Sequence, residues 1–315
     1  MPDVHLAPDH ANKTKQACEE IWMLGQPPLQ DYLDFVRRKV VNGAVLSPKK
    51  LVDEWRVAND YYYDLEETEA EIADKVEYRD LGPEFDSLVE KVMSSPQYRN
   101  TFDTLPSTFA MVELDRLVVF QPHVARHFVE DLKARLRPKP SLEALFNFCF
   151  PLGQPDADVR IQKIGSGRYT FQSQSSDFRF HEPVLLKPDQ VTDYESFGSI
   201  AGIVGLVVGF GPNFLSVLRS DNRLMLHNGY HRACALRALG ITHAPCLVQT
   251  VTRLDELYLS ASRQVAKSPA FYFKAPRPPL LKDFFDPKIR KVLPTNRLLR
   301  MIEVKFEVED HEVAE

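Results

Sequence analysis

One short stretch of the second half constrains the fold more than any other. Residues 223–226 are β-formers, Gly229 follows, and strong helix formers occupy 230–239. A strand that turns into a helix at a glycine directs backbone N–H groups and the positive helix end at one point. His231 and Arg232 add two basic side chains in the first helical turn. The sequence therefore predicts a turn that binds an anion such as phosphate.

The composition is typical of a globular protein, with 44% hydrophobic and 26% charged residues in 315. A chain of this length is long enough for two domains, each with a core of normal size. Lys and Arg number 39 against 44 Asp and Glu, which gives a net charge of −5. This balance argues against nucleic-acid binding through bulk charge and leaves a local basic patch as the route to an anionic ligand.

The N-terminus has no basic stretch followed by an apolar one, so we expect no signal peptide. The longest apolar run, 200–210, is interrupted by glycines and is shorter than the roughly 20 residues that a membrane span needs. We therefore expect a cytoplasmic protein with no membrane partner.

The cysteines show neither metal-ligand spacing nor a disulfide framework, and buried free thiols are the simplest interpretation. They are Cys18, Cys149, Cys234 and Cys246. His123 and His127 stand four residues apart, a spacing that could hold a metal, but no third ligand accompanies them. The sequence predicts no metal site and favours a structural or surface role for both histidines.

The first half is expected to be helical and to end near residue 150, between proline-rich linkers at 137–140 and 151–156. An apolar stripe with helical spacing runs through 28–36, and Ser47-Pro48 supplies a cap and a first-turn proline. The expected helices are 12–24, 28–36, one from 48 onward, 83–93, 108–120 and 124–136.

The second half changes to alternating apolar residues, which predicts strands and a mixed sheet. Residues 159–164 and 168–172 flank Gly165-Ser166-Gly167 and predict a hairpin. Further strands are expected at 177–180, 184–186, 214–218, 223–226, 246–250 and 302–308, a helix or turn region at 197–211, and helices at 230–239 and 254–262. The expected domains are 1–150, 151–270 and a proline-rich extension, 271–315, that ends in a strand.

The order of these elements resembles the ParB/sulfiredoxin superfamily over about residues 180–262, with a pattern closest to sulfiredoxin. The shared features are two strands (212–218 and 223–229), a Gly-x-(His/Arg)-Arg turn at 229–232, a helix ending in Leu-Gly, and a strand that begins after a proline. The resemblance implies a ParB/sulfiredoxin-like mixed-sheet domain. With the mainly helical N-terminal domain that the residue pattern predicts, the expected fold class is α+β.

In that superfamily the turn holds nucleotide phosphates, so the resemblance implies ATP or another nucleoside triphosphate as ligand. Gly229 would allow close backbone approach, and His231 and Arg232 would contact phosphate oxygens, which suits a guanidinium at a helix start. Three of the expected ligand-binding residues have a structural alternative. His227 is equally consistent with a half-buried structural residue, Asn228 with a residue that serves only the turn, and Lys187 with an exposed surface residue. The residues expected at the nucleotide are Lys187, His227, Asn228, Gly229, Tyr230, His231 and Arg232.

Two departures from the superfamily pattern argue against its most specific activities. Sulfiredoxin has its nucleophilic cysteine directly before His-Arg, where this chain has Tyr230, and Cys234 lies one helical turn further on. ParB proteins carry a helix-turn-helix after this domain, where this chain has only about fifty proline-rich residues. We expect neither sulfinic acid reduction nor operator-type DNA binding. The glycines between 202 and 211 do not match a dinucleotide fingerprint either.

Phosphoryl transfer needs a carboxylate that acts as base or holds Mg²⁺. The candidates are Glu182, Asp189, Asp193 and Glu195, each of which is alternatively a surface carboxylate. The leading hypothesis is an enzyme that transfers the terminal phosphate of ATP, with Mg²⁺, to a small-molecule or protein acceptor, or hydrolyses it. The alternative is a non-catalytic, nucleotide-responsive interaction protein. A third hypothesis is a nucleic-acid-associated protein. The oligomeric state is left open, with a homo-oligomer as one alternative.

Overall fold

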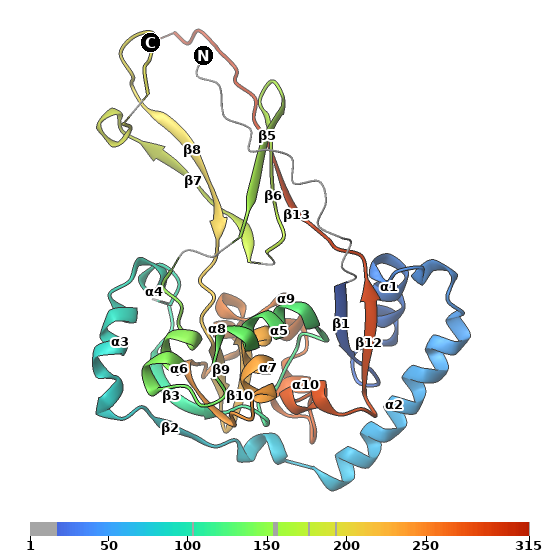
Figure 1. Cartoon of the computed structure of the whole chain (residues 1–315). Helices are drawn as coiled ribbons and strands as arrows, with labels where there is room; N and C mark the ends of the chain where they lie inside the picture. The colour runs from blue at the N-terminus through green and yellow to red at the C-terminus, as the bar shows by residue number, and fades with distance from the viewer. Residues whose placement is uncertain (1–17, 103, 154–156, 176, 193, 315) are drawn as a thin grey trace. The chain divides into compact units, whose positions relative to one another are not determined.

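The computed structural model describes residues 18–314 except 103, 154–156, 176 and 193 (Figure 1). The chain is mixed α+β, as predicted, and divides into two compact units. Unit 1 combines the residues up to Leu81 with Ser107–Cys149 and Leu215–Arg297. Unit 2 combines Gly82–Pro106, Phe150–Phe214 and the residues from Leu298 onward. Segments of all three domains expected from the sequence therefore contribute to unit 1.

A mixed five-stranded sheet forms the centre of unit 1, in the order β10-β9-β11-β3-β2. Its only parallel pair among the described strands joins β9 and β11, and the other pairs are antiparallel. The interior of β11 is buried, so its sequence is a continuous apolar run rather than an alternating one. The strands are β2 (Tyr78–Asp80), β3 (Ser107–Glu113), β9 (Ser216–Ser220), β10 (Arg223–Asn228) and β11 (His243–Thr250).

A second sheet of unit 1 has the order β12-β1-β4 and packs with two long helices. Its core contains Trp22, Tyr32, Phe35 and Tyr62, all less than 7% exposed. The predicted stripe on the first helix and the predicted Ser47 cap on the second are confirmed. The elements are β1 (Cys18–Met23), α1 (Leu29–Lys39), η1 (Gly43–Val45), α2 (Pro48–Thr68), η2 (Ile72–Lys75), β4 (His123–Ala125), η5 (Leu281–Phe285) and β12 (Arg290–Thr295).

Shorter helices complete unit 1, and α5 packs against α7 while α6 packs on β11. They are α5 (Arg126–Arg135), α6 (Leu142–Cys149), α7 (Tyr230–Ala238), α8 (Leu254–Ser260), α9 (Arg263–Lys267) and α10 (Pro269–Phe273). No helix in the described part of the chain is long and apolar enough to cross a membrane.

Unit 2 contains a three-stranded sheet, β13-β6-β5, and the two-stranded ribbon β7-β8. The predicted hairpin around Gly167 and the predicted final strand both belong to the three-stranded sheet. In this unit the ring centre of Phe214 lies 5.9 Å from that of Phe102 and 5.7 Å from that of Phe150. Its elements are η3 (Pro83–Phe85), α3 (Asp86–Met93), α4 (Pro96–Arg99), β5 (Val159–Gly165), β6 (Arg168–Ser173), β7 (Phe178–Leu186), η4 (Pro188–Gln190), β8 (Ile203–Phe210) and β13 (Arg300–Lys305).

Two predicted helices are wrong because long-range pairing overrides the local pattern, and a third begins two residues later than predicted. Residues 18–23 of the expected helix 12–24 form β1, while 12–17 lie outside the described residues. The expected helix 108–120 is β3 and a loop, since 107–113 pair with β11 and β2. The expected helix 124–136 begins only at Arg126, after β4.

Two interpretations in the ribbon also change. The helix or turn region at 197–211 contains β8, whose glycines sit in an extended strand. The two strands expected at 177–180 and 184–186 are the single strand β7. Pro183 lies inside it without ending it, because a two-stranded ribbon leaves one side of each strand free of ladder hydrogen bonds.

Candidate functional site

The predicted strand-turn-helix around Gly229 is confirmed, and its geometry requires glycine. Gly229 has φ +90° between β10 and α7. A Cβ atom there would lie 2.8 Å from Leu215 Cδ1 and 3.1 Å from Leu215 Cα. The Oδ1 atom of Asn228 accepts a hydrogen bond from the Gly229 N–H at 2.8 Å, so Asn228 serves the turn itself. His227, the residue before it on β10, is half-buried.

Tyr230 is fixed inside unit 1. Its hydroxyl donates to the carbonyl oxygen of Leu226 at 2.8 Å and accepts from the Phe120 N–H at 3.1 Å. Burial raises the pKa of the phenol. Tyr230 is therefore a buried, protonated side chain that joins β10 to the loop before β4.

Arg232 places a buried positive charge in the first turn of α7. The residue is 6% exposed, and its guanidinium carbon lies 5.3 Å from the ring centre of Phe148 on α6. A guanidinium over an aromatic ring keeps its charge while its orientation is restricted. The side chain is therefore held in place before any ligand arrives.

His231 forms a hydrogen bond to the backbone of the neighbouring strand β4. Its Nε2 atom accepts a hydrogen bond from the Ala125 N–H at 3.1 Å. Burial lowers the pKa of His231 to about 4, an effect that Glu20 opposes and that His123 and His127 reinforce. His231 is thus uncharged near neutral pH, and the positive charge at the turn comes from Arg232 and the helix end.

A carboxylate–imidazole pair next to His231 was missed by sequence reasoning. His123 Nδ1 lies 2.9 Å from Glu20 Oε2, and the imidazole stacks on Trp22 at 5.2 Å and contacts Phe35 at 4.7 Å. Glu20 and Trp22 point to one face of β1, where β1 pairs with β4. Glu20 could not be identified because residues 12–24 had a helical pattern.

His123 lies on β4 and His127 on α5. In the described part of the chain, no group of three or more His, Cys, Asp or Glu side chains is arranged to hold a metal ion. His127 is half-buried on α5, next to the ring of Phe128 at 4.2 Å, and burial lowers its pKa.

The acidic candidates belong to unit 2, whereas the turn belongs to unit 1. Glu182 is exposed on β7, Asp189 is exposed in η4, and Glu195 is exposed in the following loop. Lys187 is exposed before η4, and its backbone N–H donates to Gln190. Asp193 lies outside the described residues.

The four cysteines are free thiols. Cys149, Cys234 and Cys246 are buried, and burial raises the pKa of each thiol. None of these three is therefore a reactive thiolate near neutral pH.

Comparisons with models of protein families, with curated proteins and with solved structures found no match.

Proposed function

We propose that unit 1 contains a ParB/sulfiredoxin-like domain that binds the phosphates of ATP or another nucleoside triphosphate at Gly229–Arg232. The observation that carries this proposal is the passage from β10 through the left-handed Gly229 into α7, with a buried guanidinium in the first helical turn. Helix N–H groups, the helix dipole and a fixed guanidinium all favour a phosphate.

The reaction would be transfer of the terminal phosphate, as a Mg²⁺ complex, to a small-molecule or protein acceptor or to water. Such a transfer benefits from a base that orients the acceptor. Within unit 1 the Glu20–His123 pair has the arrangement of a base oriented by a carboxylate. His123 lies two residues before Ala125, whose backbone N–H donates a hydrogen bond to His231. Glu182, Asp189, Asp193 and Glu195 remain the candidates that the resemblance implies.

The second candidate function is a non-catalytic, nucleotide-responsive interaction protein. It is favoured by the exposure of the acidic candidates and by their position in a different unit from the turn. In this alternative the turn binds the nucleotide without turnover, and the protein responds to occupancy alone.

Isothermal titration with ATP, CTP and GTP, each with Mg²⁺, tests the binding site. We expect saturable binding of at least one nucleotide by the wild type. Arg232→Gln should weaken it at least tenfold, and Arg232→Lys, which keeps the charge, should weaken it less. Arg237→Gln is the matched control on the last turn of α7, where Arg237 pairs with Asp115 at 3.0 Å. Absence of binding by all three nucleotides would refute the proposal.

Turnover separates the two functions. Release or transfer of labelled terminal phosphate is measured in the wild type with a panel of hydroxyl acceptors. The enzyme hypothesis predicts turnover that Glu20→Gln and His123→Asn reduce at least tenfold while nucleotide affinity is retained. Binding with no turnover supports the interaction protein.

A further inference from the structure

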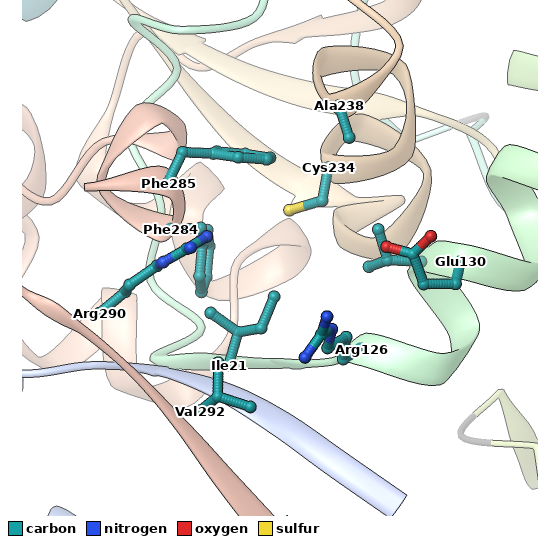
Figure 2. Close-up of a pocket in the computed structure, with 10 residues that line it drawn as sticks. Ile21, Arg126, Glu130, Cys234, Ala238, Phe284, Phe285, Arg290 and Val292 are labelled. Atoms are coloured by element: carbon teal, nitrogen blue, oxygen red, sulfur yellow. The ribbon is translucent and has the colours of Figure 1, made fainter. Parts of the chain in front are cut away.

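A second candidate site in unit 1 lies against a flank of α7 and is independent of the turn. It is a cavity of about 240 Å³ enclosed by α5, α7, η5 and the strands β1 and β12 (Figure 2). Cys234 and Ala238, one helical turn apart on α7, line one side with small side chains. Phe284, Phe285 and Ile21 contribute much of the remaining apolar wall.

The walls favour an apolar body of limited size. Cys234 and Phe284 are each 1% exposed, and burial keeps the Cys234 thiol in its neutral form by raising its pKa. A dry apolar cavity of about 150 Å³ is known to hold benzene. The cavity here is larger than that, so it accommodates one ring with a short substituent, whereas a long acyl chain exceeds it.

The charged residues at the cavity favour an anion. Arg126 pairs with Glu19 at 2.9 Å, and Glu130 pairs with Lys133 at 2.8 Å, so these two charges are already balanced. No carboxylate among the described residues forms an ion pair with Arg290. Figure 2 shows the Arg290 guanidinium next to Phe284 and Arg126 on the other side of the cavity, with Ile21 between the two arginines in this view.

We propose that this cavity binds a compact apolar monocarboxylate about the size of one ring. The ring or branched body packs against Phe284, Phe285 and Cys234, and the carboxylate pairs with the guanidinium of Arg290. Apolar contacts in a concave site with one or two directed polar groups are the usual composition of a small-molecule site. An Arg–carboxylate pair then determines the orientation of the ligand.

Titration of the full chain with benzoate tests this proposal, with benzylamine and benzyl alcohol as probes of the same size and different charge. Binding is measured by isothermal titration and by line broadening of fluorobenzoate in ¹⁹F spectra. We expect saturable binding of benzoate, at least tenfold weaker binding of the alcohol, and none of the amine. Arg290→Gln should weaken benzoate binding at least fivefold.

Two variants separate the cavity from nonspecific binding. Ala238 is exposed at the edge of the cavity, so Ala238→Leu is compatible with the fold and should abolish benzoate binding by occupying the opening. Arg253→Gln changes an exposed arginine that does not line the cavity and should leave binding unchanged. The proposal is overturned by no benzoate binding, by equal binding of the amine, or by unchanged binding in Ala238→Leu. Nucleotide titrations of the same variants measure binding at the turn before α7 separately from binding in the cavity.

Discussion

Among the described residues, the most buried charged side chains form a single network in unit 1. Arg277 is 1% exposed, and its two terminal nitrogens donate to the two carboxylate oxygens of Asp283 at 2.6 and 2.7 Å. The Tyr62 hydroxyl and the Leu280 N–H also donate to Asp283, and Glu69 accepts from Arg277. A buried pair is tolerated only when its hydrogen bonds are satisfied in this way.

Removing one partner of this network should destabilise unit 1 strongly. Asp283→Ala leaves the Arg277 charge buried without its main partner, so the free energy of unfolding in urea should fall by about 3–5 kcal/mol. Asp255→Ala is the control, because Asp255 forms an exposed pair with Arg253 and should change stability by less than about 1 kcal/mol. Equal losses in the two variants would contradict this ranking.

The neutral state of His231 predicts a pH dependence of stability. The pKa of His231 is lowered from 6.5 to about 4 in the folded chain, mainly by burial. As pH falls, the unfolded state therefore binds a proton at His231 before the folded state does. The stability that neutral His231 allows above pH 6.5 is lost as pH falls toward 4. This loss amounts to about 1–3 kcal/mol.

Urea unfolding at pH 7.5 and pH 4.5 measures this dependence. His231→Gln keeps an acceptor for the Ala125 N–H but cannot take up a proton, so it should lose less stability between the two pH values than the wild type does. His311→Gln, in the exposed C-terminal segment, should behave like the wild type. An identical pH dependence in all three proteins would contradict the assignment.

At the scale of the element, the turn before α7 tolerates no side chain at Gly229. Gly229→Ala combines a positive φ with a contact of 2.8 Å to Leu215 and should destabilise by about 2–4 kcal/mol. Gly240 also has a positive φ, at +78°, but a Cβ there meets no atom within 4 Å. Gly240→Ala should therefore lose only about 1 kcal/mol. Thermal unfolding of both variants measures the difference between the two losses of stability. Similar losses in Gly229→Ala and Gly240→Ala would contradict the prediction.

Elements were predictable from the sequence where local chemistry alone determines them. The turn at Gly229, the hairpin around Gly167 and the Ser47 cap each depend on residues close in sequence. The strand β3 was taken for a helix because its apolar residues fit both periods, and its partners β2 and β11 lie far away in sequence. Long-range pairing cannot be read from a local pattern.

The same distinction applies to the candidate site. Gly229 and Arg232 belong to one local motif and were identified by it. The Glu20–His123 pair joins residues 103 positions apart, through the register of β1 on β4. The neutrality of His231 depends on its burial against Ala125 of β4 and Phe128 of α5, which no feature of residues 229–240 indicates.

At the scale of the whole molecule, unit 1 depends on three separate segments of the chain. The strand β11 pairs with β3 from the first half, and β1 pairs with β12 near the other end. The fragment 151–270, which the sequence suggested as a domain, lacks β1, β3 and β12. We expect this fragment to give poorly dispersed amide NMR spectra and no cooperative unfolding, and a folded, nucleotide-binding fragment would contradict this.

The pairing of β1 with β12 also sets an order of events during synthesis. Cys18 lies opposite Thr295, so the first described strand must wait until residue 295 has left the ribosome before its sheet can close. Closing so long a loop is slow relative to local folding. In nascent chains that stop before residue 290 this sheet therefore cannot form. We expect cellular quality control to recognise and degrade such chains.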